Sequence, residues 1–186
     1  MKTGPAARAS ARAFVPWLAL AALLVLAAFA WATNPGPRWR VADNQQADGN
    51  VLFDDDPVPA ADVEAMGDLL IAGTVIEWRG HGDLELISPG SAVLVLRPGT
   101  VMTLPAPPAR WFARTSRAFL TEGTVVFVAG PRFRGARLVV ETPARTFTAD
   151  SGAFSLTHDP SAGTLVVDRG ADLEEFVRTK RNLLER

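Results

Sequence analysis

The chain has 186 residues, a formal net charge of −1 and no cysteine, and these values exclude several classes of protein. The length allows one domain of ordinary size plus an appendage. Binding to nucleic acid is not expected, because neutralising phosphates requires a clear excess of lysine and arginine. Without cysteine the chain forms no disulfide, no iron–sulfur cluster and no cysteine-ligated zinc site.

The N-terminal region combines a basic leader with a long apolar run. Residues 1–13 contain Lys2, Arg8 and Arg12, and the run from Phe14 to Ala32 carries no charge. A charge-free run of about 18 or more residues is long enough for a membrane-spanning helix, and a basic leader keeps its own end in the cytoplasm. The sequence therefore predicts a cytoplasmic leader, a transmembrane helix at 14–32, and export of the rest of the chain.

A cleavable signal peptide is the alternative for this segment. Ala28-Phe29-Ala30 and Ala30-Trp31-Ala32 match the small-x-small pattern of a cleavage site. An uncleaved anchor is favoured, because the run is longer than the ~7–15 residues of a signal-peptide core and Trp17 and Trp31 suit the two membrane interfaces. The predicted location is the bacterial inner membrane, single-pass, with the C-terminal domain in the periplasm. Cleavage would instead release the protein into the periplasm.

Residues 33–59 are predicted to form a linker. Asn34-Pro35-Gly36-Pro37 ends the apolar helix, because proline cannot continue it. The acidic run Asp54-Asp55-Asp56 raises the question of calcium. A helix–loop–helix calcium site, however, requires alternating ligands with a central glycine and a distal glutamate. That pattern is absent, and we interpret the run as a solvated acidic linker.

Residues 60–170 are predicted to form an all-β domain. A short helix is expected between Ala60 and Leu70 with Asp62 as its N-cap, unless Leu69 already opens the first strand. Beyond it, apolar and polar residues alternate and glycine or proline interrupts at short intervals, which is typical of short antiparallel strands in a sandwich, barrel or solenoid-like domain. The candidate strands are Thr74–Trp78, Asp83–Ile87, Ala92–Arg97, Val101–Leu104, Arg110–Arg114, Ala118–Leu120, Thr124–Val128, Arg137–Glu141, Arg145–Thr148, Phe154–Thr157 and Thr164–Asp168.

Residues 171–186 are predicted to form a short C-terminal helix. Asp172 and the glutamates after it stand where a first helical turn favours acid. The apolar residues Phe176, Val177, Leu183 and Leu184 fall mostly on one helical face. We expect this helix to pack on the β domain, and a partner-binding helix is the alternative.

One cluster in the sequence combines arginine with aromatic residues. Its members are Arg110, Trp111, Phe112, Arg114, Arg117, Arg132, Phe133 and Arg134, and Arg137 follows them. Such a patch suits an anionic partner or a glycan, because guanidinium groups attract negative charge and stack on aromatic rings. The alternative, which the strand alternation favours, is that these arginines keep the outer face of edge strands soluble.

No pattern for catalysis or metal binding is found. His81 and His158 are the only histidines, they are far apart in sequence, and neither has metal-ligand spacing; both are predicted to be exposed turn residues. Asp150-Ser151-Gly152 places a serine beside a carboxylate, but no nucleophile elbow surrounds it. Phosphate-binding glycine loops are also absent. We therefore predict a protein that is not an enzyme and has no cofactor or metal.

Five segments of the β region occur in an order that resembles the FecR domain. They are Val93–Val101 (VLVLRPGTV), Phe119–Val125 (FLTEGTV), Val139–Ala144 (VVETPA), Phe154–Leu156 (FSL) and Thr164–Gly170 (TLVVDRG). The resemblance covers Gly73 to Gly170 and implies an exported β domain next to a membrane helix. Where that family has Gly-Thr before the phenylalanine, this chain has Ser151-Gly152.

FecR-type sigma regulators also carry, ahead of their membrane helix, a cytoplasmic domain that holds the sigma factor. Residues 1–13 are too few to form such a domain. The resemblance therefore implies a membrane-anchored periplasmic binding or sensing module in envelope signalling, partnered by an anti-sigma-like or outer-membrane protein. The alternative is a structural or assembly protein of the envelope or of a secretion system. Sensing predicts a monomeric domain that recognises a partner, whereas assembly predicts self-association.

Overall fold

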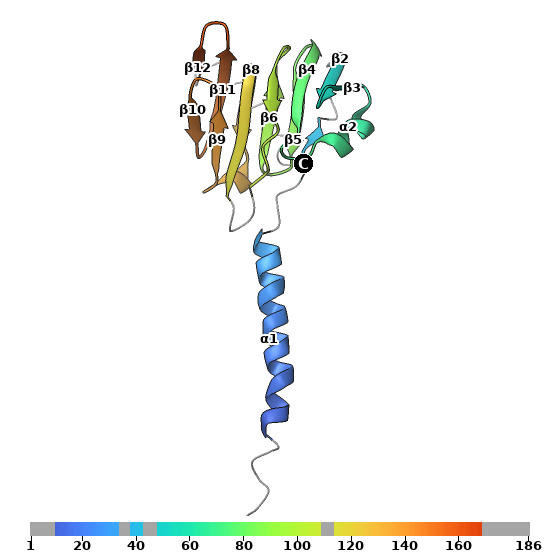
Figure 1. The fold of residues 1–186 in the computed structure, drawn as a ribbon, viewed down its shortest axis with the longest axis vertical. Coiled ribbons are helices and arrows are strands. Elements are labelled where there is room, and N and C mark those ends of the chain that lie inside the picture. Colours follow the sequence, from blue (N-terminus) through green and yellow to red (C-terminus); the bar gives the residue numbers. More distant parts are fainter. Residues whose placement is uncertain (1–9, 34–37, 43–47, 109–113, 169–186) are drawn as a thin grey trace, which may run out of the picture.

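A computed structural model of the chain describes residues 10–33, 38–42, 48–108 and 114–168. It contains one long helix, α1 (Ser10–Thr33), and a β domain from which that helix projects (Figure 1). The predicted helix at 171–186 lies outside the described residues. The predicted all-β character of the domain is confirmed, because nearly all of its described elements are strands.

Helix α1 contains the whole of the apolar run in its 24 residues. Its described side chains are strongly exposed, with Leu18 at 68%, Leu23 at 64% and Val25 at 67%. Within the part of the chain that the structure describes, no helix combines the length and the apolar character needed to cross a membrane.

The β domain is built on one sheet of twelve strands. The strands are β1 (Arg40–Val41), β2 (Asp48–Phe53), β3 (Asp56–Pro59), β4 (Val75–His81), β5 (Leu84–Ser88), β6 (Ala92–Leu96), β7 (Val101–Thr103), β8 (Thr115–Ala129), β9 (Arg137–Glu141), β10 (Thr146–Ala149), β11 (Ala153–Asp159) and β12 (Thr164–Asp168). The helix α2 (Val63–Leu69) and the 3-10 turn η1 (Pro131–Phe133) complete the described domain. Neighbouring strands run antiparallel apart from β8 and β9, which are parallel.

Strand β8 is the element along which the sheet curls. Its second half pairs with β6 on one side and β11 on the other, and its first half pairs with β7 and β9. The first group continues through β5 and β1 and through β12, and the second continues through β4, β2 and β3 and through β10. The sheet therefore folds over β8 into a half-barrel whose two halves face one another across a shared core.

The change of direction in β8 falls at Gly123, which has a φ of +91°. A Cβ atom at this position would lie 2.5 Å from the Thr100 Cα, so a residue with a side chain does not fit. The buried Thr100 hydroxyl lies beside this glycine. It accepts a hydrogen bond from the Thr124 N–H at 3.0 Å, and its oxygen lies 2.6 and 2.8 Å from the carbonyl oxygens of Arg97 and Thr124. Glycine and threonine together fix the corner between the halves.

The main core contains an aromatic cluster. The Phe127 ring meets Phe133 edge to face, with centroids 5.1 Å apart, and stacks on Phe154 at 5.2 Å. Trp78 is fully buried in the same core. Contacts of this kind add about 0.5–1.5 kcal/mol per ring pair beyond the burial of apolar area.

The opposite face of β5, β6 and β8 carries a second buried cluster. It is formed by Ala42, Ile87, Val93, Val95, Val126 and Val128. Strand β6 is buried along its entire length, because alternate side chains point into one cluster or the other. A strand covered on both faces has a continuous apolar sequence, which explains the uninterrupted run from Ala92 to Leu96.

The predicted linker at 33–59 is wrong for the residues described there. β1, β2 and β3 belong to the sheet, and Trp39, Val51 and Phe53 are each buried to at least 95%. The acidic run contains the turn between β2 and β3. Asp54 and Asp55 have φ values of 49° and 76°, the left-handed conformation that a tight two-residue hairpin turn requires.

Most predicted elements from residue 60 onward are confirmed. The short helix is α2, and the Asp62 carboxylate caps it by accepting from the Ala65 N–H at 3.0 Å. β9 and β12 have the predicted bounds, and the other described strands differ by a few residues at their ends. The strands predicted separately at Ala118–Leu120 and Thr124–Val128 are both parts of β8.

Candidate functional site

Because β8 changes direction at Gly123, it begins and ends at the same end of the β domain. Described arginines of the predicted cluster lie together at that end. Arg114 directly precedes β8, and the turn from Arg132 to Gly135 follows it. The Arg114 guanidinium donates to the carbonyl oxygens of Arg132 at 3.1 Å, Arg134 at 2.6 Å and Gly135 at 3.3 Å. Arg114 therefore clamps the two ends of β8 together, and its role is structural.

The remaining described members divide between surface and core. Arg117 donates to the Glu141 carboxylate at 3.0 Å, across the β8–β9 pair, in an exposed ion pair of small energetic value. Arg132 and Arg134 are exposed. Phe133 between them is only 2% exposed and belongs to the aromatic core, so its predicted place in a surface patch is wrong.

The other three members, Arg110, Trp111 and Phe112, lie outside the described residues. Arg137, which the sequence already grouped with this cluster, lies at the same end of the domain, and the structure adds Arg38 and Arg40; all three are exposed. Sequence reasoning missed Arg40 because it missed β1, in which Arg40 pairs with Ile87 of β5. The patch therefore contains more arginines, and fewer described aromatic residues, than predicted.

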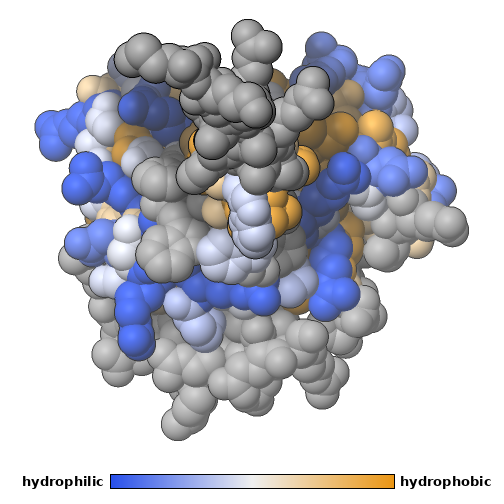
Figure 2. Space-filling view, turned by 90° about the horizontal axis from the view of Figure 1, so that it is seen from below, coloured by the Kyte–Doolittle hydropathy of each residue, from blue (hydrophilic) through white to orange (hydrophobic). Residues whose placement is uncertain are grey.

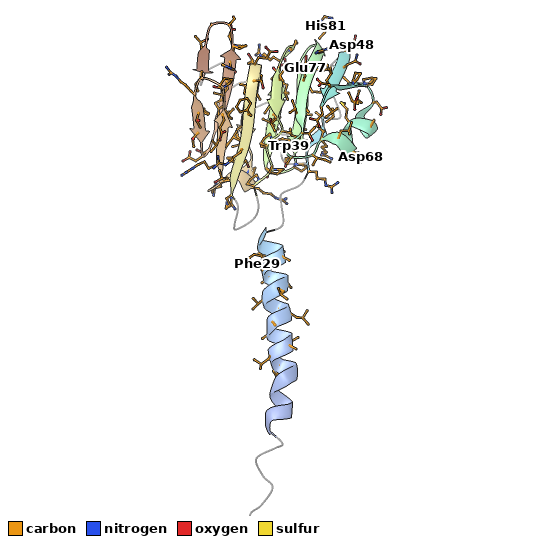
Figure 3. The ribbon with its side chains drawn as sticks, in the orientation of Figure 1. Phe29, Trp39, Asp48, Asp68, Glu77 and His81 are labelled. Carbon is orange, nitrogen blue, oxygen red and sulfur yellow. The ribbon has the colours of Figure 1, made fainter. Side chains whose placement is uncertain are left out.

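A small cavity lies beneath this end. Trp39, labelled in Figure 3, donates from its indole Nε1 to the Pro105 carbonyl at 2.7 Å and holds the Pro105–Pro108 segment against the core. The cavity has a volume of about 10 Å³, and the buried Ser91 and Ser116 hydroxyls line it. That volume suits one water molecule and excludes an organic ligand.

A larger groove runs over the outer surface of β2, β4 and β7. Its volume is about 260 Å³, and its lining includes Asp54, Asp55 and Glu77. The Glu77 carboxylate accepts a hydrogen bond from Arg79, and this bond together with the nearby negative charge raises the pKa of Arg79 above its usual value. Among the described residues, no group of three or more histidine and carboxylate side chains is placed to hold a metal ion.

The two histidines differ in their surroundings. His81 is exposed at the end of β4. His158, predicted to be an exposed turn residue, is 2% exposed on β11, so that prediction is wrong. Its Nδ1 lies 3.1 Å from the Thr164 carbonyl oxygen, which accepts only, so Nδ1 carries the hydrogen. This hydrogen bond joins β11 to β12 through a buried side chain.

The turn of this hairpin is held by Asp159. Its carboxylate accepts from the Ser161 hydroxyl at 2.6 Å and from the Ser161 and Ala162 N–H groups at 2.9 and 3.3 Å. These bonds favour the ionised form and lower the pKa of Asp159 below its ordinary value. The arrangement stabilises a turn and offers no group for reaction chemistry.

Comparisons of this chain with protein families, curated proteins and solved structures found no match. A proposal of function therefore depends on the arrangement of the molecule itself: a projecting apolar helix, a β domain with its own core, and an arginine-rich end between them.

Proposed function

We propose that this chain is a membrane-anchored, non-catalytic binding or sensing module of the bacterial envelope, with its β domain in the periplasm. The observation that carries the proposal is the division of the molecule seen in Figure 1, where α1 extends away from a β domain that buries its own core. A bilayer would remove apolar side chains as exposed as Leu18 and Val25 from water, which is favourable. The basic leader supports export of the domain.

The partner in this proposal is another envelope protein, either anti-sigma-like or an outer-membrane protein, as the FecR resemblance implies. In this proposal the protein partner binds to the surface of the β domain. The groove lined by Asp54, Asp55 and Glu77 offers a partner a negatively charged surface over β2, β4 and β7. The small cavity beside Trp39, in contrast, is too small for a substrate.

A structural or assembly role is the second candidate, and the edge strand β12 favours it. Among the described strands β12 pairs with β11 alone, and its Val166 and Val167 are 57% and 40% exposed. An apolar edge strand is able to add a strand from another chain, including a second copy of the same protein. Self-association through β12 would place the protein in an assembly.

Affinity purification of the full chain from detergent-solubilised bacterial envelope tests the two roles. Sensing predicts a monomeric chain that recovers a transmembrane anti-sigma-like protein or an outer-membrane receptor in near-stoichiometric amount. Recovery of the chain alone, as a large species on sizing, would overturn the sensing role in favour of assembly. Release of the chain from membranes by alkaline carbonate would overturn the anchor itself.

A matched pair of variants sharpens the comparison. Val166→Lys places a charge on the exposed edge strand, which blocks strand addition. Thr148→Lys places the same charge on β10, where Thr148 is also exposed. Assembly through β12 predicts that the large species is lost in the first variant and kept in the second, whereas sensing predicts monomers and unchanged partner recovery in both.

A further inference from the structure

Charge is divided between the two ends of the β domain. The end next to α1 carries the exposed arginines Arg38, Arg40, Arg132, Arg134 and Arg137. Asp150, just after β10, lies at the same end, and the acidic residues of α2 lie on its flank. We call the five arginines the basic end.

The backbone holds these arginines in fixed relative positions. Arg40 pairs with Ile87, just before the turn that joins β5 to β6. The Arg132 side chain lies against Gly90 in that turn, where an added Cβ would come within 3.1 Å of the Arg132 Nε. The Arg137 N–H donates to the Arg114 carbonyl at 2.8 Å. The basic end is therefore a surface built by two segments of the chain, 38–40 and 132–137, and it does not depend on a single loop.

The basic end faces helix α1. The helix ends at Thr33, and an extended chain spans at most about 3.6 Å per residue, so Arg38 lies within about 18 Å of that end. In Figure 3 Trp39 is labelled in the half of the domain nearer to the helix, at about the height of Asp68. Figure 2, which views this end from below, shows hydrophilic residues together with hydrophobic ones around the axis of the helix.

The opposite end of the domain is acidic. It carries Asp48, Asp83, Glu122 and Asp159 together with the arginine Arg97, and Arg79 lies two residues before His81 on β4. Asp48 pairs with His81, and both are labelled at the end remote from α1 in Figure 3. A negatively charged surface would attract one end of the domain and repel the other, so the charges select a single orientation.

We propose that the basic end docks on the anionic phospholipid headgroups of the membrane that α1 enters. This inference rests on the proposed function, since it takes α1 as the anchor. A guanidinium group donates two parallel hydrogen bonds to a phosphate, which makes arginine well suited to headgroups. The attraction is confined to about 8 Å at physiological salt, so it acts only on an end that the helix already holds near the bilayer.

The absence of cysteine permits a direct test on the full chain. Ser151→Cys places a fluorophore at the basic end and Ala162→Cys places one at the acidic end, both at exposed positions. Each labelled chain is reconstituted into phosphatidylcholine vesicles with or without phosphatidylglycerol. We expect phosphatidylglycerol to lower acrylamide quenching of the Ser151 label severalfold and to increase its quenching by headgroup-nitroxide lipid, with no change at Ala162. High salt is expected to reverse both effects.

Charge reversal supplies the matched control. Arg132→Glu combined with Arg134→Glu is expected to abolish the lipid-dependent protection, while Arg97→Glu at the acidic end is expected to keep it. The Arg114 clamp uses the backbone carbonyl groups of Arg132 and Arg134, so the double variant retains those hydrogen bonds. An equal loss of protection in Arg97→Glu would overturn docking through the basic end.

Flotation of the vesicles tests the membrane anchor, and therefore the proposed function, independently of docking by the basic end. A chain that floats with both kinds of vesicle, but whose Ser151 label is quenched equally in each, has an anchor and no docking, and the basic end is then available to a protein partner. That result overturns the inference alone. A chain that does not float with either kind of vesicle lacks the anchor, which overturns the proposed function and the inference with it.

Discussion

The Thr100 hydroxyl is the polar group on which the corner of the half-barrel depends. It is buried, accepts from the Thr124 N–H and lies within hydrogen-bond distance of two carbonyl oxygens. Thr100→Val keeps the shape of the side chain and removes every one of these bonds. We expect a loss of about 1–3 kcal/mol in the free energy of unfolding, because the Thr124 N–H is left without a partner, whereas the two carbonyl oxygens still accept from backbone N–H groups.

Thr100→Ser is the control for this prediction. It keeps the hydroxyl and removes a methyl group, which costs about 1 kcal/mol through lost apolar burial. Urea denaturation of the full chain in detergent, followed by tryptophan fluorescence, measures both variants. A valine variant as stable as the original, or less harmed than the serine variant, would show that the hydroxyl does not hold the corner.

Phe133 and His158 show what local sequence cannot reveal about single residues. Both were expected at the surface because arginine, aspartate, glycine and proline surround them. Phe133 is buried by Phe127, and the His158 ring is fixed by the Thr164 carbonyl group. The contact with Phe127 depends on how β8 and η1 are placed in space. Neighbouring residue types indicate the polarity of a segment, but they do not indicate which side chain the fold will cover.

At the scale of elements, comparing two glycines distinguishes the cost of a left-handed backbone conformation from the cost of a steric clash. Gly99 and Gly123 both have positive φ, at +78° and +91°. An added Cβ at Gly99 meets nothing within 4 Å, whereas at Gly123 it meets the Thr100 Cα at 2.5 Å. Gly99→Ala is therefore expected to cost about 1–2 kcal/mol from the left-handed conformation alone.

Gly123→Ala is expected to cost more than Gly99→Ala, since it must also displace the backbone at the corner of β8. Hydrogen exchange should show the additional effect in β8 and its partners β7 and β11. Urea denaturation gives the total free energy for each variant. Equal costs for the two alanines would mean that the corner of β8 adjusts easily, and that glycine is needed there only for its φ.

The strands that the sequence predicted and those that it missed differ in how clearly apolar and polar residues alternate in them. Alternation of apolar and polar residues was sufficient for the strands from β4 to β12, although it divided β8 at Gly123. It failed for β1 to β3, because β1 has two residues and β3 contains two prolines. The edge strands β1 and β3 bury little and β3 carries turn residues, so their sequence resembles that of a linker. Pairing with β4 and β5, which the sequence does not display, makes them part of the sheet.

At the scale of the whole molecule, net charge conceals how charge is arranged. The formal net charge of −1 argued against nucleic acid as a partner, but this sum over the whole chain conceals an arginine-rich end of the β domain. Several of these arginines were visible in the sequence as a cluster. Their common position next to α1 depends on the pairing of β1 with β5 and on the turn after β8, both of which are tertiary features.

Because β8 belongs to both halves of the sheet, the β domain is expected to unfold as a single cooperative unit. β6 pairs with the second half of β8, and β4 is joined through β7 to the first half. Loss of β8 pairing removes support from both halves and opens the core they share. Native-state hydrogen exchange at increasing urea should therefore give buried amides of β4 and β6 the same opening free energy. Gly123→Ala should lower both values equally. Opening of β4 at a lower free energy while β6 stays protected would instead mean that the halves are separate folding units that β8 merely connects.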